Sequence, residues 1–338
     1  ERIAELAEKY YPYVRELRHE FHRNPELSWK EIRTSRRVME ELERMGVPYQ
    51  AHCGNETNVA AYIKGSGSGL GKTIMLRADM DALPIQEDES HELCSETPGV
   101  MHACAHDGHI ASMLGAVRIL NELKDQFSGT IKIAFEAGEE DGGGAKDFVK
   151  AGFLDDVEAV FGCHLFGTVK EGVFATRVGD FMSASDALWL KIRGRGGHSS
   201  TPHLAVDPVN IAAQFITDSQ AIVARMAAPT DIAVLGFSTI QGGTVYNTIP
   251  DEVNISGSLR CFSEETRELI RRGMEGILKG LCQAYGAEYE LRYTNTMYAV
   301  HNDERLTKMA VESAAKVVGS DHIDLLQYPQ MGSETFAF

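Results

Sequence analysis

One short stretch of the sequence concentrates groups that could bind a metal ion. Residues 101–109 contain one thiol and three imidazoles, and two later segments add the adjacent carboxylates of Glu139 and Glu140 and the imidazole of His164. Thiolate, imidazole and carboxylate are the protein groups that bind zinc and similar divalent ions, and thiolate favours the softer metals. The combination predicts a metal-binding hydrolytic centre.

Each of these segments alone has a simpler interpretation. Cys104 and His106 are compatible with a loop whose side chains only satisfy backbone groups, and Glu139 and Glu140 with a solvated acidic turn. His164 closes an apolar segment, where histidines are more often hydrogen-bonded core residues. Only together do they favour a metal site. In an extended chain, adjacent carboxylates point to opposite sides, so one can bind a metal while the other removes a proton from water.

The composition restricts the partners of the protein. The formal net charge is -16, from 49 acidic and 33 basic residues, which argues against a nucleic-acid partner. No apolar run approaches the roughly 20 residues that cross a bilayer, so we expect no membrane partner. The six cysteines are scattered and read as reduced thiols, which favours a cytoplasmic protein, although a removed leader stays an open alternative.

The first half of the chain alternates apolar strands, polar loops and amphipathic helices. This alternation predicts an α/β domain with a mostly parallel sheet, whose strands end at the candidate residues. The predicted helices are residues 1–22, 34–45, 110–123 and 145–151, and the predicted strands are 58–63, 73–76, 130–135 and 159–164.

The pattern changes near Ser183. A β-α-β-β-α-β order follows, which resembles the ferredoxin-like plan. Its predicted elements are strand 187–192, helix 207–226, strands 232–240 and 252–260, helix 264–285 and strand 287–293, and helix 303–318 then returns to the first domain. We therefore predict a discontinuous catalytic domain, residues 1–182 with 294–338, and an inserted α+β domain, residues 183–293.

Several motifs, in matching order along nearly the whole chain, resemble the amidohydrolase branch of the family-20 metallopeptidases. That branch includes aminoacylase-like, hippurate-hydrolase-like and auxin-conjugate hydrolases. The motifs are residues 17–27, Arg77-Ala78-Asp79-Met80-Asp81-Ala82-Leu83-Pro84, residues 101–109, the Glu pair with Gly142-Gly143-Gly144-Ala145, and Gly197-His198-Ser199-Ser200. The resemblance implies a zinc-exopeptidase-like catalytic domain with two divalent ions (Zn, Mn, Ni or Co). It also implies a lid domain that forms a homodimer or higher homo-oligomer.

The resemblance also implies roles for individual residues. Matching positions give the metal ligands Cys104, His106, Glu140 and His164, the general base Glu139 and the supporting acid Asp81. In the lid, His198 matches a residue that stabilises the oxyanion, often from the partner subunit, and Asn247 and Arg260 match positions that bind polar groups of the substrate.

The sequence departs from the family pattern at some positions. Ala105 and Asp141 stand where the family usually has glycine, Glu136-Ala137 where it has Gln-Pro, and Thr335 where it has aspartate. The family also supplies one more histidine ligand beyond the position of Phe338. Either the given sequence is part of a longer chain, which we favour, or the second metal position lacks a ligand.

We predict a metal-dependent amidohydrolase that uses a metal-activated water to cleave the amide bond of N-acyl amino acids or related conjugates. The alternatives are a dipeptidase or exopeptidase of the same fold, and a metal-binding homologue without turnover. A metal-free hydrolase with Cys104 as nucleophile is more remote. A serine hydrolase is disfavoured because the chain has no Gly-x-Ser-x-Gly elbow.

Overall fold

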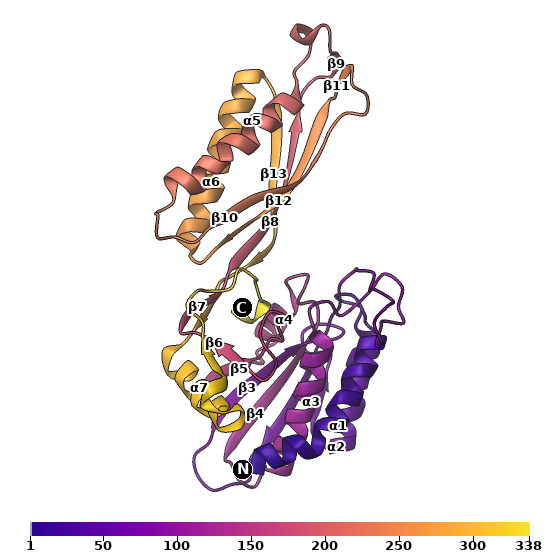
Figure 1. Cartoon of the computed structure of the whole chain (residues 1–338), viewed down its shortest axis with the longest axis vertical. Helices are drawn as coiled ribbons and strands as arrows, with labels where there is room; N and C mark the ends of the chain where they lie inside the picture. The colour runs from indigo at the N-terminus through magenta and orange to yellow at the C-terminus, as the bar shows by residue number, and fades with distance from the viewer. Residues whose placement is uncertain (1) are drawn as a thin grey trace. The chain divides into compact units, whose positions relative to one another are not determined.

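The computed structural model describes residues 2–338, apart from the side chain of Asn295. The chain divides into two compact units (Figure 1). The first contains residues up to Thr176, together with Asp303–Leu326 and Phe338. The second contains Arg177–Asn302 and Gln327–Ala337. Each unit is described by itself below.

The first unit is built on a five-stranded sheet with the order β1-β2-β4-β3-β5. Strands β4, β3 and β5 are parallel, whereas β1, β2 and β4 are antiparallel neighbours. The sheet is therefore mixed, and the predicted mostly parallel sheet is not confirmed. Residues 52–58 are too short for a crossover between parallel strands, which explains the antiparallel pairing of β1 with β2. The strands are β1 (Tyr49–Ala51), β2 (Val59–Lys64), β3 (Lys72–Asp79), β4 (Gly129–Glu136) and β5 (Ala159–Gly162).

Three helices, α1 (Arg2–Arg23), α2 (Ile32–Met45) and α3 (His106–Glu122), share one apolar core with strands β2 and β4 of this sheet. Phe21, Leu42, Leu114 and Ile133 are fully buried in this core. A second cluster packs Phe148 of α4 (Gly144–Lys150) against other residues of the sheet. The unit is completed by β6 (Phe174–Thr176), α7 (Glu304–Val318), the 3-10 turn η3 (Ser320–His322) and β15 (Ile323–Leu325).

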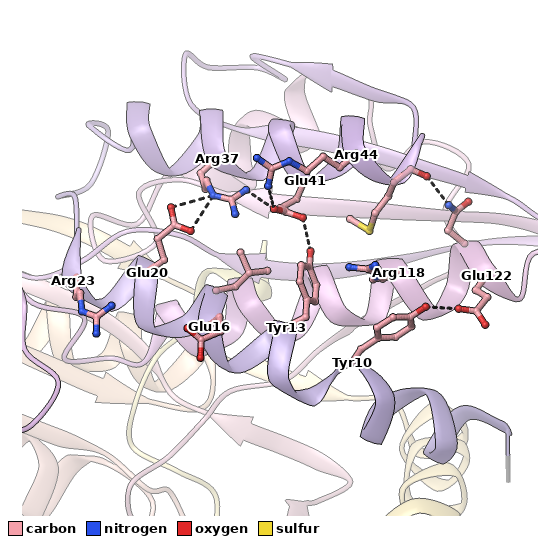
Figure 2. A pocket seen from close by; sticks show the side chains of 13 residues that line it. Tyr10, Tyr13, Glu16, Glu20, Arg23, Arg37, Glu41, Arg44, Arg118 and Glu122 are labelled. Carbon is pink, nitrogen blue, oxygen red and sulfur yellow. Dashed lines mark hydrogen bonds and ion pairs between the residues drawn. The ribbon is translucent and has the colours of Figure 1, made fainter.

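The outer surface of α1, α2 and α3 carries a charged hollow of about 710 Å³ (Figure 2). Glu41 accepts hydrogen bonds from Tyr13, Arg37 and Arg44, and Arg37 also binds Glu20. The acidic and basic groups thus largely neutralise each other across helices. We interpret these ion pairs and hydrogen bonds as structural links between the helices, because the residues predicted to do chemistry do not line the hollow.

The second unit is an antiparallel sheet of order β10-β12-β8-β13 that packs against α5 (Pro208–Ala221) and α6 (Glu264–Tyr285). The chain order of these elements is β-α-β-β-α-β, the ferredoxin-like arrangement. The strands are β8 (Ala184–Arg193), β10 (Val234–Gln241), β12 (Glu252–Cys261) and β13 (Glu288–Met297). Smaller elements are β7 (Gly179–Met182), β9 (Gly197–His198), η1 (Pro202–Leu204), η2 (Ile222–Met226), β11 (Thr248–Ile249), β14 (Val300–Asn302) and η4 (Thr335–Ala337).

The predicted helices and strands are all present, with ends shifted by a few residues. Two shifts concern the site. Helix α3 begins at His106 and not at Ile110, because Ala105 adopts a left-handed conformation (φ 62°) that turns the chain into the helix. Strand β5 ends at Gly162, so His164 lies in the following loop. Among the described residues, no helix is both long and apolar enough to cross a bilayer.

Candidate metal centre

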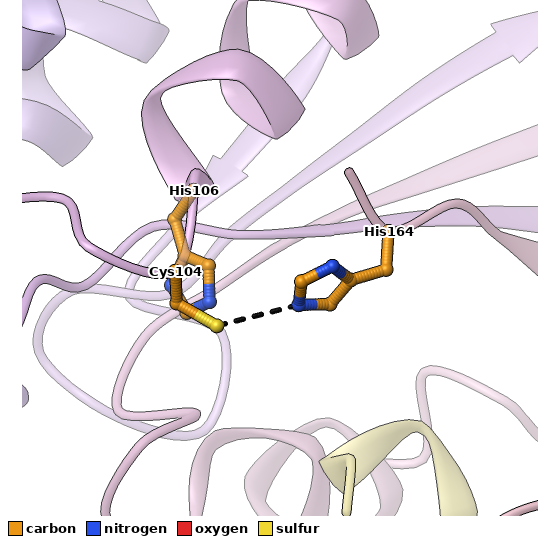
Figure 3. Close-up of side chains that lie close together, drawn as sticks. All are labelled: Cys104, His106 and His164. Carbon is orange, nitrogen blue, oxygen red and sulfur yellow. Dashed lines mark hydrogen bonds between the residues drawn. The ribbon is translucent and has the colours of Figure 1, made fainter. Parts of the chain in front are cut away.

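Three of the predicted ligands converge although they are far apart in sequence. The Sγ atom of Cys104 lies 3.3 Å from Nε2 of His164, and these two side chains and His106 have ligand atoms within 4.8 Å of one another (Figure 3). Cys104 precedes α3, His106 begins it, and His164 follows β5. A thiol and two imidazoles at this spacing can bind one metal ion.

His106 also belongs to a second group of possible ligands, with Glu139 and Glu140. Both carboxylates follow β4, and parallel strands β3, β4 and β5 end at the same edge of the sheet. The four predicted ligands and the predicted base therefore meet at the strand ends, where α/β sheets carry their active sites.

Asp81 connects the two parts of this centre. Its carboxylate accepts hydrogen bonds from the backbone N–H groups of Glu139 (3.1 Å) and Glu140 (3.0 Å) and from the hydroxyl of Ser28 (2.6 Å). The same carboxylate lies 3.3 Å from Nδ1 of His106. Asp81 thus orients the imidazole and fixes the backbone of both glutamates, which agrees with a supporting role and not with direct metal binding.

The electrostatics of the centre depend on its burial. Burial lowers the pKa of His106, but the carboxylates of Asp79 and Asp81 outweigh this and hold it well above its usual value. Burial raises the pKa of the Cys104 thiol and of the Glu140 carboxyl. Metal binding needs these ligands in their deprotonated forms, so a bound cation would compete with protons for all three.

The residues present fit a divalent metal ion. Nε2 of His106 and Oε1 of Glu140 are buried, lie 3.8 Å apart and have no hydrogen-bond partner among the described residues. Buried polar atoms normally have a partner, and these two atoms are both metal-ligand types. With the adjacent thiol of Cys104, they form a donor set that suits zinc or a similar transition metal.

Sequence reasoning missed two residues that support this centre. Nδ1 of His109 lies 2.5 Å from the carboxylate of Asp79, and Nε2 of His109 accepts a hydrogen bond from the N–H of Leu165 (2.8 Å). His109 therefore holds the chain beside His164. Asp79 is in turn bound by the guanidinium of Arg77 at 2.8 Å. Two features of the sequence could have indicated these residues. Asp79 is a further carboxylate two residues before Asp81, and His109 follows His106 by about one helical turn.

The other predicted site residues belong to the second unit. His198 lies in β9, opposite Thr248 of β11, and its Nδ1 is 2.8 Å from the hydroxyl of Ser200. The carbonyl of Asn247 accepts a hydrogen bond from the N–H of Ser199, so the two segments form one exposed ribbon.

Arg260 lies in β12 of the same unit. Its guanidinium donates to the hydroxyl of Ser333 (2.8 Å) and to the carbonyl of Met331 (3.3 Å), and burial lowers its pKa.

Comparison with known proteins adds the family. A model of the peptidase family M20/M25/M40 matches residues 75–338. The chain belongs to this family. The thermostable carboxypeptidase 2 of Saccharolobus solfataricus is 37% identical to this chain over 341 residues. The match covers 100% of this chain and 85% of the carboxypeptidase. An N-acyl-L-amino acid amidohydrolase of Geobacillus stearothermophilus is 38% identical over 294 residues, covering 87% and 79%.

Solved structures agree. A structure from methicillin-resistant Staphylococcus aureus matches with a TM-score of 0.88 and 32% identity, covering 99% of this chain and 86% of that one. The YXEP protein of Bacillus subtilis, described as a dinuclear metal-binding peptidase of the M20 family, matches with a TM-score of 0.80 and 30% identity, covering 98% and 85%. The predicted family is confirmed, and with it the class of this M20 member: a metal-dependent amidohydrolase or peptidase.

Proposed function

We propose that this enzyme hydrolyses the amide bond of N-acyl amino acids or related conjugates. The observation that carries the proposal is the convergence of Cys104, His106 and His164 with the carboxylates of Glu139 and Glu140. Relatives named N-acyl-L-amino acid amidohydrolase, N-acetylcysteine deacetylase and IAA-amino acid hydrolase support this substrate class.

In this proposal, Cys104, His106, Glu140 and His164 hold two divalent ions, which we expect to be Zn, Mn, Ni or Co. When bound, such ions polarise the scissile carbonyl and lower the pKa of water. Glu139, which is only 5% exposed, acts as the general base: it accepts the proton of the attacking water and delivers it to the leaving amine. The carboxylate of Asp81 holds the backbone N–H of Glu139 in place.

The second unit supplies substrate contacts in this proposal. His198 would stabilise the developing oxyanion from the partner subunit of a homodimer, and the ferredoxin-like unit would serve as lid and dimerisation domain. Asn247 and Arg260 would bind polar groups of the substrate, and the guanidinium of Arg260 suits a carboxylate. A cytoplasmic location is part of the same proposal.

A second candidate function is a carboxypeptidase or dipeptidase. It is favoured by the relatives named carboxypeptidase, whose identity to this chain is similar to that of the amidohydrolases. An N-acyl amino acid and a dipeptide share a carboxylate beside the scissile amide, so the proposed centre suits both.

A third candidate uses Cys104 as a nucleophile, because its Sγ lies 3.3 Å from Nε2 of His164. Burial raises the pKa of this thiol, whereas a nucleophilic cysteine needs a lowered pKa. We therefore favour the metal-dependent reaction.

A substrate panel with matched variants tests the proposal. N-acyl amino acids and dipeptides are compared at equal concentration, with and without a chelator. We expect turnover of the acyl amino acids that the chelator abolishes and added metal restores. Chelator-resistant turnover would instead support Cys104 as nucleophile, and a preference for dipeptides would support the peptidase.

Replacement of the proposed base sharpens the test. Glu139→Gln removes the proton acceptor but keeps the size of the side chain, so we expect kcat to fall by about 10²- to 10⁴-fold. Metal content, measured by elemental analysis, should stay unchanged, because in this proposal Glu140 binds the metal and Glu139 acts as the base. Retained activity would remove Glu139 from the mechanism.

A further inference from the structure

A turn before helix α2 packs directly on the loop that carries Glu139 and Glu140. Trp29 lies in this turn in a left-handed conformation (φ 67°), and its indole N–H donates to the carboxylate of Asp141 at 2.9 Å. The ring also covers two glycines of the loop. A Cβ atom at Gly138 or Gly143 would lie only 2.7 or 2.3 Å from indole carbon atoms. The indole therefore contacts the loop before, beside and after the two glutamates.

Glu31, two residues later, holds the start of the same loop. Its side chain is 0% exposed. One carboxylate oxygen accepts the backbone N–H groups of Gly138 (2.8 Å) and Trp29 (3.0 Å), and the other accepts the hydroxyl of Thr57 (3.0 Å). Glu31 thus binds the turn and the loop to each other and to the segment before β2.

Two buried carboxylates accept hydrogen bonds from different backbone N–H groups of this loop. Glu31 accepts the N–H of Gly138, and Asp81 accepts the next two, those of Glu139 and Glu140. Three successive N–H groups are therefore fixed from two separate segments of the chain. A backbone held in this way limits the directions in which both glutamate side chains can point.

We propose that Trp29 and Glu31 are positioning residues that set the directions of the Glu139 and Glu140 carboxylates by holding residues 138–143. The inference rests on the proposed function of these two glutamates. A proton acceptor and a metal ligand must be placed to within about 0.5 Å, so a loop free to relax would lose both proton transfer and metal affinity.

Two variants of Glu31 separate position from charge. Glu31→Gln keeps one oxygen for the two backbone N–H groups, and its amide can donate to the hydroxyl of Thr57. Glu31→Ala removes every contact. We expect Glu31→Ala to lower kcat by at least about 30-fold with less than a threefold change in KM, and to weaken metal affinity by about 10-fold. Glu31→Gln should stay within about threefold of the parent in both measurements.

Two variants of Trp29 test the second contact. Trp29→Phe keeps an aromatic face over the glycines but loses the N–H to Asp141, and Trp29→Ala loses both. We expect a small loss for Phe and a loss of about 10-fold or more in kcat for Ala. Trp189→Phe is the matched control, because Trp189 is the only other tryptophan of the chain and lies on the second unit, 55% exposed.

Metal affinity is measured by competition with a chelator on the purified protein, with circular dichroism to verify folding. This measurement needs no substrate. If the parent turns over none of the tested amides, the proposed function fails while the affinity series still tests the positioning role. Parent-like metal affinity and kcat in Glu31→Ala would overturn the inference. So would a Glu31→Gln variant as impaired as Glu31→Ala, since charge and not position would then matter.

Discussion

The proposed metal ligands and the proposed substrate residues are held in very different ways. In the first unit, His106 is 1% exposed, and the buried carboxylates of Asp79 and Asp81 lie within 3.7 Å of its ring. In the second unit, His198 lies on an exposed two-stranded ribbon, and its ring contacts Ser200 two residues away. The comparison teaches that the imidazole of the metal centre is buried among carboxylates from other segments, whereas the imidazole on the ribbon is hydrogen-bonded to a residue of its own turn.

Replacing one histidine from each region should give the largest difference. His106→Asn removes a possible ligand that Cys104 and His164 share with Glu139 and Glu140, so we expect metal affinity to fall by at least about 100-fold and activity to be lost. His198→Asn should leave metal content unchanged and lower kcat by about 10²- to 10³-fold, as expected for an oxyanion donor.

Elemental analysis and kcat measured on both variants test this pair. Loss of metal in His198→Asn would break the comparison, because the ribbon residue would then belong to the metal centre. Full metal content in His106→Asn would also contradict the comparison, because His106 would then not be a metal ligand.

The buried support of the first unit should also make its stability depend on pH. Burial raises the pKa of Glu31 from 4.5 to about 7. The folded chain therefore binds this proton more tightly than the unfolded chain does. The resulting stabilisation is present below about pH 4.5 and is lost as the pH rises through about 7. Glu31→Gln cannot ionise and lacks this dependence.

Between pH 5 and pH 8, we expect the free energy of unfolding of Glu31→Gln to rise relative to the parent by about 1–3 kcal/mol. Urea denaturation of the metal-free proteins at both pH values measures this difference. An equal pH dependence in the two proteins would show that Glu31 does not titrate in this range.

The smallest expected effect concerns the residue between two proposed ligands. Ala105 has a φ of 62°, a conformation that costs a residue with a Cβ atom about 1–2 kcal/mol, and glycine adopts it freely. Because glycine also gains freedom in the unfolded chain, we expect Ala105→Gly to stabilise the protein by about 0.5–1 kcal/mol. Thermal unfolding measures the change. A destabilised variant would contradict the claim that the backbone of Ala105 is strained.

The sequence allowed the helices, the strands and the candidate ligands to be predicted, because each depends on local patterns. Periodic apolar residues marked α1 and α2, and the residue types of Cys104 and His106 indicated metal chemistry. The structure explains why the family usually has glycine at the position of Ala105, since this position has a left-handed backbone.

The supporting residues could not be predicted in the same way. Glu31 reads in the sequence as an acidic residue shortly before a predicted helix, and Trp29 as an apolar residue in a turn. Their contacts with Gly138 and Asp141 arise only when the chain folds. The direction of β2 was missed for a similar reason, because an apolar strand does not indicate whether it pairs parallel or antiparallel with β4.

The most direct test of the metal centre uses a metal that reports its own ligands. The purified protein is stripped of metal and titrated with Co²⁺, and the absorbance of thiolate-to-cobalt charge transfer is followed. We predict that this absorbance develops with the parent protein and with His198→Asn, and is absent from Cys104→Ser. A parent protein that binds no cobalt, or whose cobalt spectrum does not change in Cys104→Ser, would contradict the proposed centre.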